Sequence, residues 1–171
     1  MPEYVALLRG VSPVNAKMAD LRDAFTAAGF TRVKTVLASG NVLFDSLMTC
    51  EDELEAACRD AMGNGLGRVF PTIIRPLGEL RAIVEADPFA GFEVAPQAKP
   101  VVTFLHHPPA VMPQLPIIAD GVSIFFADQR SVYTAYVVNS TGPVFMNLIE
   151  TTFGKDVTTR TWQTVRRCAT A

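Results

Sequence analysis

Two groups of polar and charged residues in this sequence could form a ligand-binding or catalytic site. The first follows the apolar stretch 4–8 and recurs near residue 40; its members are Arg9, Ser12, Asn15, Lys17, Ser39, Gly40 and Asn41. Arginine and lysine supply positive charge, and turns and helix N-termini supply backbone N–H groups, so this set suits a phosphate or a carboxylate. Simpler roles are also open: a solvated arginine, a helix cap at Asn15 and a hairpin turn at 40–41.

The second group lies near the C-terminus and comprises Asn147, Glu150, Arg160 and Trp162. Asn147 and Glu150 are three residues apart and would share one helix face. Glu150 could act as a base or orient Arg160, or it could form an ordinary salt bridge. Trp162 could stack on a nucleic-acid base or an arginine, or it could pack in the core.

The two histidines of the chain are adjacent, at positions 106 and 107. Consecutive side chains of a strand point to opposite faces, so His106 and His107 are predicted to be poor ligands for one metal ion. One of them could still serve as a general base. We therefore expect no metal site and no cofactor. The sequence holds none of the short motifs of phosphate-binding loops, serine hydrolases or zinc proteases.

The elements that must position the first group follow the order strand, helix, strand, strand, helix, strand. Strands are predicted over 4–9, 31–38, 42–45 and 68–74, with helices that begin after Asn15 and after Thr49. Pro71 inside the fourth strand indicates an edge position. This is the ferredoxin-like split βαβ order, whose sheet runs 4-1-3-2. In that fold the end of the first strand, the turn at 39–41 and a glycine-rich loop at 63–67 share one end of the sheet.

The second half repeats this order less completely. Strands are predicted over 101–106, 121–127, 132–138 and 157–160, and helices over 109–115, 144–153 and 162–168, the first of them interrupted by prolines. We predict an α+β fold of two ferredoxin-like βαββαβ halves, an internal duplication with mainly antiparallel sheets. The expected parts are an N-terminal subdomain 1–76, a connecting helix and linker 77–100, and a C-terminal subdomain with a terminal helix 101–171.

Charge and hydropathy narrow the class of protein. The 171 residues carry 15 Lys+Arg and 17 Asp+Glu, a formal net charge of -2, and neither half of the chain is basic. Nucleic acid is therefore an improbable partner. No apolar run approaches a membrane span and the first residues do not resemble a signal peptide, so a soluble cytoplasmic protein is expected. Cys50, Cys58 and Cys168 are expected to stay unbridged.

Three motifs resemble the bacterial family called domain of unknown function 1697. They are Tyr-Val-Ala-Leu-Leu-Arg-Gly at 4–10, Ser-Gly-Asn-Val-Leu-Phe at 39–44 and Thr-Thr-Arg-Thr-Trp-Gln-Thr at 158–164. The resemblance also covers Asn147 and Glu150, and it implies two α+β subdomains of ferredoxin-like type. It implies no particular reaction, because no activity is established for the family. The loop 12–15 and the pair 143–144 depart from the glycines and the lysine that many members carry there.

Three functions stay open at this point. The first is binding of a small anion or a nucleotide without chemistry. The second is an enzyme acting on a phosphorylated or acyl substrate, in which Arg9 and Arg160 stabilise charge while Glu150 or a histidine moves protons. The third, an RNA-binding module, is expected least, because the strand near 41–45 has one aromatic and no basic residue.

Overall fold

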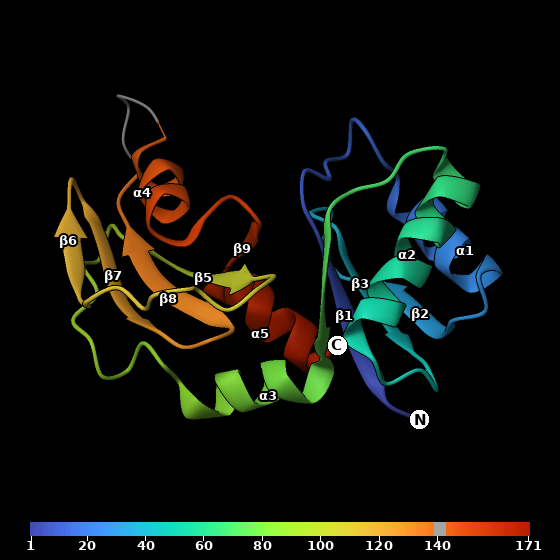
Figure 1. Cartoon of the computed structure of the whole chain (residues 1–171), viewed down its shortest axis with the longest axis horizontal. Helices are drawn as coiled ribbons and strands as arrows, with labels where there is room; N and C mark the ends of the chain where they lie inside the picture. Colours follow the sequence, from blue (N-terminus) through green and yellow to red (C-terminus); the bar gives the residue numbers. More distant parts are fainter. Residues whose placement is uncertain (139–142) are drawn as a thin grey trace. The chain divides into compact units, whose positions relative to one another are not determined.

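The computed structural model describes residues 1–138 and 143–171, and the chain divides into two compact units. Unit 1 comprises Met1–Glu85 and Arg166–Ala171, and unit 2 comprises Ala86–Val165 (Figure 1). The described residues form five helices and two antiparallel sheets, of four and five strands, so the predicted α+β class is confirmed. In this part of the chain, no helix has both the length and the apolar character needed to span a bilayer.

Unit 1 is a four-stranded sheet with two helices packed on one face. Its elements are β1 (Glu3–Leu8), α1 (Met18–Ala27), β2 (Thr31–Thr35), β3 (Asn41–Asp45), α2 (Glu51–Leu66), β4 (Thr72–Pro76) and α3 (Leu77–Ala86). The strand order is β2-β3-β1-β4, and each neighbouring pair is antiparallel. Read from the other edge, this is the order 4-1-3-2 that the sequence predicts for the first half.

The central strand β1 organises the core of unit 1. Its apolar run Val5–Leu8 is buried on both faces, as a central strand of continuous apolar residues must be. Alternate residues of β1 pack with α1 and α2, which lie together on one side of the sheet (Figure 1). This core includes Tyr4, Ala6, Leu8, Leu21, Phe25, Phe44, Leu54, Met62 and Ile74.

The helix ends of unit 1 differ from the predicted ones. The N-cap of α1 is Lys17, not Asn15, and the N-cap of α2 is Cys50, not Thr49. The predicted loop at 63–67 is wrong, because α2 continues through Gly63 to Leu66 and ends at Gly67, whose φ is +66°. A side chain at Gly65 would stand 2.5 Å from Ala24 Cβ, so this glycine lets α2 continue against α1.

Two strands of unit 1 also have different limits. β2 ends at Thr35 rather than 38, because the chain turns at Leu37, whose φ is +59°. β4 begins at Thr72, so Pro71 precedes the strand instead of lying in it. The predicted edge position of β4 is correct, and the carbonyl of Pro71 accepts a hydrogen bond from the backbone N–H of Arg9 at 2.9 Å.

Unit 2 is a five-stranded sheet with one helix on a face. Its elements are β5 (Lys99–Leu105), β6 (Ile117–Ala119), β7 (Val122–Ala127), β8 (Ser131–Tyr136), α4 (Val144–Phe153) and β9 (Val157–Thr161), followed by the start of α5 (Trp162–Thr170). The order is β6-β7-β8-β5-β9, all antiparallel. Phe145 and Ile149 of α4 pack on Val101, Leu105 and Val157 of the sheet.

The predicted helix at 109–115 is wrong. Residues 109–115, all within the described part of the chain, contain no helix, and the short strand β6 follows instead and pairs with β7. The prolines at 108, 109, 113 and 116 remove the backbone donors that a helix requires. Because unit 2 lacks this helix, it does not reproduce the whole βαββαβ order, and the internal duplication stays a prediction.

Candidate functional site

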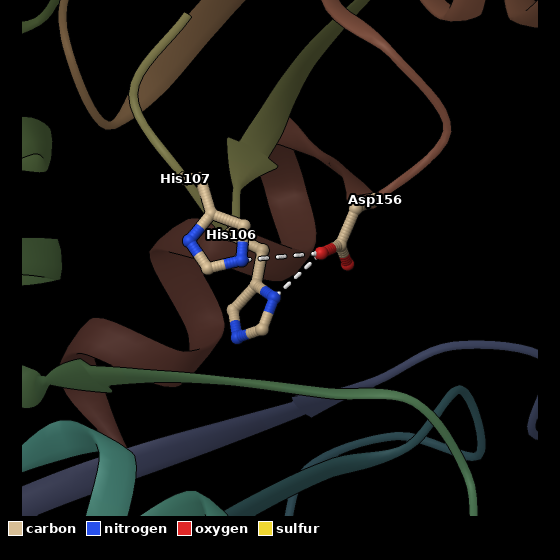
Figure 2. A group of neighbouring side chains, drawn as sticks. All are labelled: His106, His107 and Asp156. Carbon is tan, nitrogen blue, oxygen red and sulfur yellow. Dashed lines mark hydrogen bonds and ion pairs between the residues drawn. The ribbon is translucent and has the colours of Figure 1, made fainter.

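Three potential metal-ligand side chains meet in unit 2 where β5 ends and β9 begins. They are His106, His107 and Asp156, and Figure 2 shows both imidazole rings beside the carboxylate. β5 and β9 pair antiparallel up to Leu105 and Val157. The backbone N–H of His106 then donates to the carbonyl of Asp156 at 3.2 Å, so the pairing extends by one more residue. The sheet itself therefore holds His106 opposite Asp156.

The carboxylate of Asp156 bridges the two histidines. Its Oδ2 lies 2.6 Å from Nδ1 of His106 and 3.7 Å from Nε2 of His107. The two ring centroids are 4.2 Å apart, and the possible ligand atoms of all three residues lie within 4.8 Å of one another. The side chain of His106 is 22% exposed, whereas those of His107 and Asp156 are 73% and 62% exposed. The cluster is thus supported by the sheet on one side and open to solvent on the other.

The prediction that His106 and His107 point apart is wrong. It assumed that both lie on a strand, but β5 ends at Leu105, so the alternation of strand side chains does not apply to them. The proline after His107 further restricts its backbone to extended conformations. Asp156 was missed: it directly precedes the predicted strand 157–160, but the sequence does not give the register that places residue 156 opposite residue 106.

This cluster can do two kinds of chemistry. Imidazole nitrogens and a carboxylate oxygen are ligands of zinc and related divalent ions. A carboxylate hydrogen-bonded to a histidine is also the arrangement that orients an imidazole as a general base. The geometry of the three residues fits either use.

Unit 1 has a hollow of about 370 Å³ at the start of α1. Its polar and charged lining residues are Asn15, Lys17, Asp20 and Arg68. Lys17 is the N-cap residue of α1. Among the described residues, its side chain makes no hydrogen bond to the backbone of the first turn, so this end of the helix has no side-chain cap. The Arg68 guanidinium carbon lies 4.8 Å from the centroid of the Phe70 ring. Two cations from separate elements therefore flank the N-terminus of a helix.

The hollow contains two of the seven residues of the first predicted group. Asn15 and Lys17 line it, whereas Arg9, Ser12 and the turn at 39–41 are not among its lining residues. The Asn15 carboxamide closes the preceding loop: Oδ1 accepts from the Ser12 N–H at 2.8 Å, and Nδ2 donates to the Gly10 carbonyl at 2.7 Å. Arg68 was not predicted, although a basic residue directly after the glycine that ends a helix was the available signal.

The turn at 39–41 meets the loop after β1, as the ferredoxin-like order predicts. Leu8 donates its backbone N–H to the Gly40 carbonyl at 2.8 Å, and a side chain at Gly40 would stand 2.9 Å from Val11 Cβ. Asn41 is fully buried. Its Nδ2 donates to the Val36 carbonyl at 2.8 Å and to Ser39 Oγ at 3.0 Å. These hydrogen bonds join residues of the turn to one another, so the side chains of Ser39 and Asn41 stabilise the turn.

The second predicted group is divided between two sides of the unit 2 sheet. Asn147 and Glu150 are on α4, which covers the face that carries Val157. Arg160 alternates with Val157 along β9, so it lies on the opposite face, buried, with Nη1 donating to the Thr159 carbonyl at 3.0 Å. Trp162 packs edge-on against Phe89, with ring centroids 5.3 Å apart. Glu150 and Arg160 therefore belong to opposite faces of the sheet, and Trp162 packs as the structural alternative expects.

Fold and sites together define an α+β protein of two antiparallel-sheet units, with an exposed histidine–aspartate cluster in one and a basic hollow in the other. The chain belongs to the family described as "Protein of unknown function (DUF1697)", whose model matches residues 1–133. The family predicted from the sequence motifs is thereby confirmed, with the motifs at 4–10 and 39–44 inside the matched range and the motif at 158–164 outside it. The matched range contains His106, His107, Lys17 and Arg68, whereas Asp156 lies outside it.

A solved structure supports the fold. The conserved bacterial protein of known structure from Streptococcus pneumoniae superposes with a TM-score of 0.73 at 18% sequence identity, over 99% of this chain and 97% of that chain. At this identity the similarity concerns the fold alone. No curated protein sequence matches the chain significantly.

Proposed function

We propose that unit 1 binds a small anion, such as a sugar phosphate or a nucleotide, in the hollow at the start of α1. The observation that carries this proposal is the presence of Lys17 and Arg68 on the wall of one hollow that also contains an uncapped helix N-terminus. Unpaired backbone N–H groups and the positive end of the helix dipole favour negative charge at that position. Arginine and lysine add charge-assisted hydrogen bonds to a phosphate.

The composition of the hollow favours one class of anion over others. Its volume of about 370 Å³ is near the lower end of ordinary ligand pockets, roughly 300–1,000 Å³. Asp20 also lines it and reduces the positive charge. A carboxylate accepts hydrogen bonds from hydroxyl groups, so a phosphate attached to a hydroxylated sugar suits this lining better than a bare dianion.

The alternative is an enzyme acting on a phosphorylated or acyl substrate, with Arg9 and Arg160 stabilising charge. Arg9 does not line the hollow, and Arg160 belongs to the other unit. Glu150 is on α4, which packs on the face of the sheet opposite to the face that carries Arg160, so these two residues do not favour a shared catalytic site. A site that only binds an anion therefore accounts for the hollow with fewer functional side chains than an enzyme would need. An RNA-binding module remains the least supported function.

The finer fold prediction also belongs with these proposals. We propose that both units are ferredoxin-like, because unit 2 without β6 has the order β7-β8-β5-β9, which is again 4-1-3-2 read from the other edge. The proposed parts remain 1–76, 77–100 and 101–171, and a cytoplasmic location remains a prediction.

A titration of purified protein tests the anion site. The probes are inorganic phosphate, ribose 5-phosphate, adenosine monophosphate and citrate, followed by thermal shift and by amide chemical shifts. A ligand at a hundredfold excess over its dissociation constant stabilises the protein by roughly 2.7 kcal/mol. We expect ribose 5-phosphate or the nucleotide to perturb the amides of residues 17–20.

Matched variants locate the effect. Lys17→Gln and Arg68→Gln should each weaken binding by about tenfold to a hundredfold, since a hydrogen bond to a charged group contributes roughly 1.5–3 kcal/mol. Arg22→Gln removes an exposed cation of α1 that does not line the hollow, and it should leave the affinity unchanged. A response that is equal in all three variants, or no response to any probe, refutes the anion site.

A further inference from the structure

We infer that His106, His107 and Asp156 form a binding site for one divalent transition-metal ion of the zinc type. The inference goes beyond the anion hollow, because it concerns another unit and other chemistry. The ligand atoms would be Nδ1 of His106, Nε2 of His107 and a carboxylate oxygen of Asp156, which already point toward a common point (Figure 2).

The distances fit a site that needs only side-chain rotation to close around an ion. Zinc–ligand bonds of 2.0–2.2 Å in a tetrahedron place neighbouring ligand atoms roughly 3.4 Å apart. Asp156 Oδ2 lies 2.6 Å from His106 Nδ1 and 3.7 Å from His107 Nε2, values on either side of that separation. The remaining separation is at most 4.8 Å. The three ligand atoms are therefore already close to the spacing that one zinc ion requires.

The backbone beneath the site is fixed. His106 and Asp156 lie opposite each other at the ends of paired strands, joined by a backbone hydrogen bond of 3.2 Å. The proline that follows His107 restricts the backbone of His107 and disfavours a helical conformation there. Asp156 immediately precedes β9 and lies two residues after Gly154, the C-cap of α4. Sites supported by strand ends keep their geometry better than sites on free loops.

The kind of ion follows from the ligand set. Two imidazoles and one carboxylate suit zinc, iron, cobalt, nickel or copper, whereas magnesium and calcium prefer oxygen ligands alone. Three protein ligands leave at least one coordination position for water, and the exposure of His107 (73%) and Asp156 (62%) leaves room for it. An open position is the feature that separates reactive zinc sites from closed structural ones.

The chain offers few competing ligands, which makes the test direct. His106 and His107 are its only histidines, so the imidazole region of an NMR spectrum contains these two residues and no others. Of the cysteines, Cys50 is exposed while Cys58 and Cys168 are buried. Burial also raises the pKa of the Cys58 thiol, which disfavours the thiolate that a metal requires. A Cys50→Ser background therefore removes the one accessible thiol.

The experiment is a zinc titration of the full chain, purified without a polyhistidine tag, by calorimetry and by imidazole NMR. We expect one zinc ion per chain and simultaneous shifts of both imidazoles, unchanged in the Cys50→Ser background. Cobalt should give the visible absorption of a low-coordinate site. His106→Gln, His107→Gln and Asp156→Asn should each weaken zinc binding at least tenfold, since even residues that only support a metal ligand contribute 10- to 100-fold.

Asp120→Asn is the matched control. Asp120 is an exposed carboxylate of the turn between β6 and β7, at the far edge of the same sheet, and its φ of +50° is one that asparagine tolerates. This variant should bind zinc as the parent does. A shift of one imidazole alone, no shift at millimolar zinc, or equal binding by the Asp156→Asn variant would overturn the inference and leave His106–Asp156 as a hydrogen-bonded pair.

Discussion

Asn41 gives the sharpest distinction between a structural turn and a binding site at the end of β1. The sequence allows both uses, and the motif at 39–41 is one of those that carry the family resemblance. In the structure the side chain is fully buried and its Nδ2 donates two hydrogen bonds, to Val36 and to Ser39. We predict that Asn41→Ala lowers stability and leaves anion affinity unchanged.

The magnitude follows from the two hydrogen bonds. Each contributes a net 1 kcal/mol or so, within a range of about 0.5–1.5 kcal/mol, which gives roughly 2 kcal/mol for the pair. The carbonyl of Val36 loses its side-chain partner, but Val36 is only partly buried and water can replace part of that bond. A loss of about 2–3 kcal/mol is therefore expected. Ser39→Ala removes one acceptor from a partly exposed position and should cost no more than about 1 kcal/mol.

Native-state hydrogen exchange is the suitable assay, because it resolves the two units. The single tryptophan, Trp162, lies in unit 2 and would not report on the turn. In the Asn41→Ala variant, the free energy of opening measured for the amides of β1 and β3 should fall by about 2–3 kcal/mol. The amides of β5 and β8 should keep their protection. Unchanged protection of β1 together with lost binding of every anion would refute the structural role and return the turn to the binding site.

Two further predictions concern the packing and charge of unit 1. Gly63→Ala should stabilise α2 by up to about 1 kcal/mol, because a side chain there has its nearest contact at an ordinary 3.6 Å. Gly65→Ala should instead destabilise by about 1 kcal/mol, because overpacking against Ala24 at 2.5 Å costs about 1–3 kcal/mol; equal effects in chemical denaturation would refute this contrast. The side-chain hydrogen bond from Arg81 lowers the pKa of Glu3. The stabilisation that this ion pair gives to the fold is therefore complete above the ordinary carboxyl pKa of 4.5, and it is lost as the pH falls through the lowered pKa of Glu3. Arg81→Gln should therefore lower the melting temperature more at pH 7 than at pH 3, and an equal loss at both would contradict it.

The sequence was sufficient for elements whose limits are set by local chemistry. The continuous apolar run of β1 and the helix α4, which ends at Gly154, lie where the pattern predicts them. Predictions failed where tertiary contacts decide the limit. Glycines at 63 and 65 read as a loop, yet the contact of Gly65 with Ala24 keeps that stretch helical. No local pattern contains that contact.

The candidate sites show the same division. The charged Lys17 and the polar Asn15 were predicted from the loop that bears them, but Arg68 joins the hollow through the packing of α2 near α1. The predicted strand 101–106 ended one residue too late, and the alternation of its side chains was wrongly extended to His106 and His107. A one-residue error in a strand limit changes the direction of a side chain completely, so site geometry is more sensitive to such errors than the fold is.

The residues that carry the family resemblance and the residues that could do chemistry are largely different sets in this chain. Gly40 and Asn41 hold the turn against β1, and Arg160 lies buried beside its own strand. Lys17, Arg68, His107 and Asp156 have the exposed groups that a ligand or an ion can reach, and they stand outside the three motifs. A motif that fixes a backbone turn explains why sequences share a fold, but it does not choose a ligand. Function in this protein is therefore best sought at the basic hollow and the histidine–aspartate cluster rather than at the motif residues.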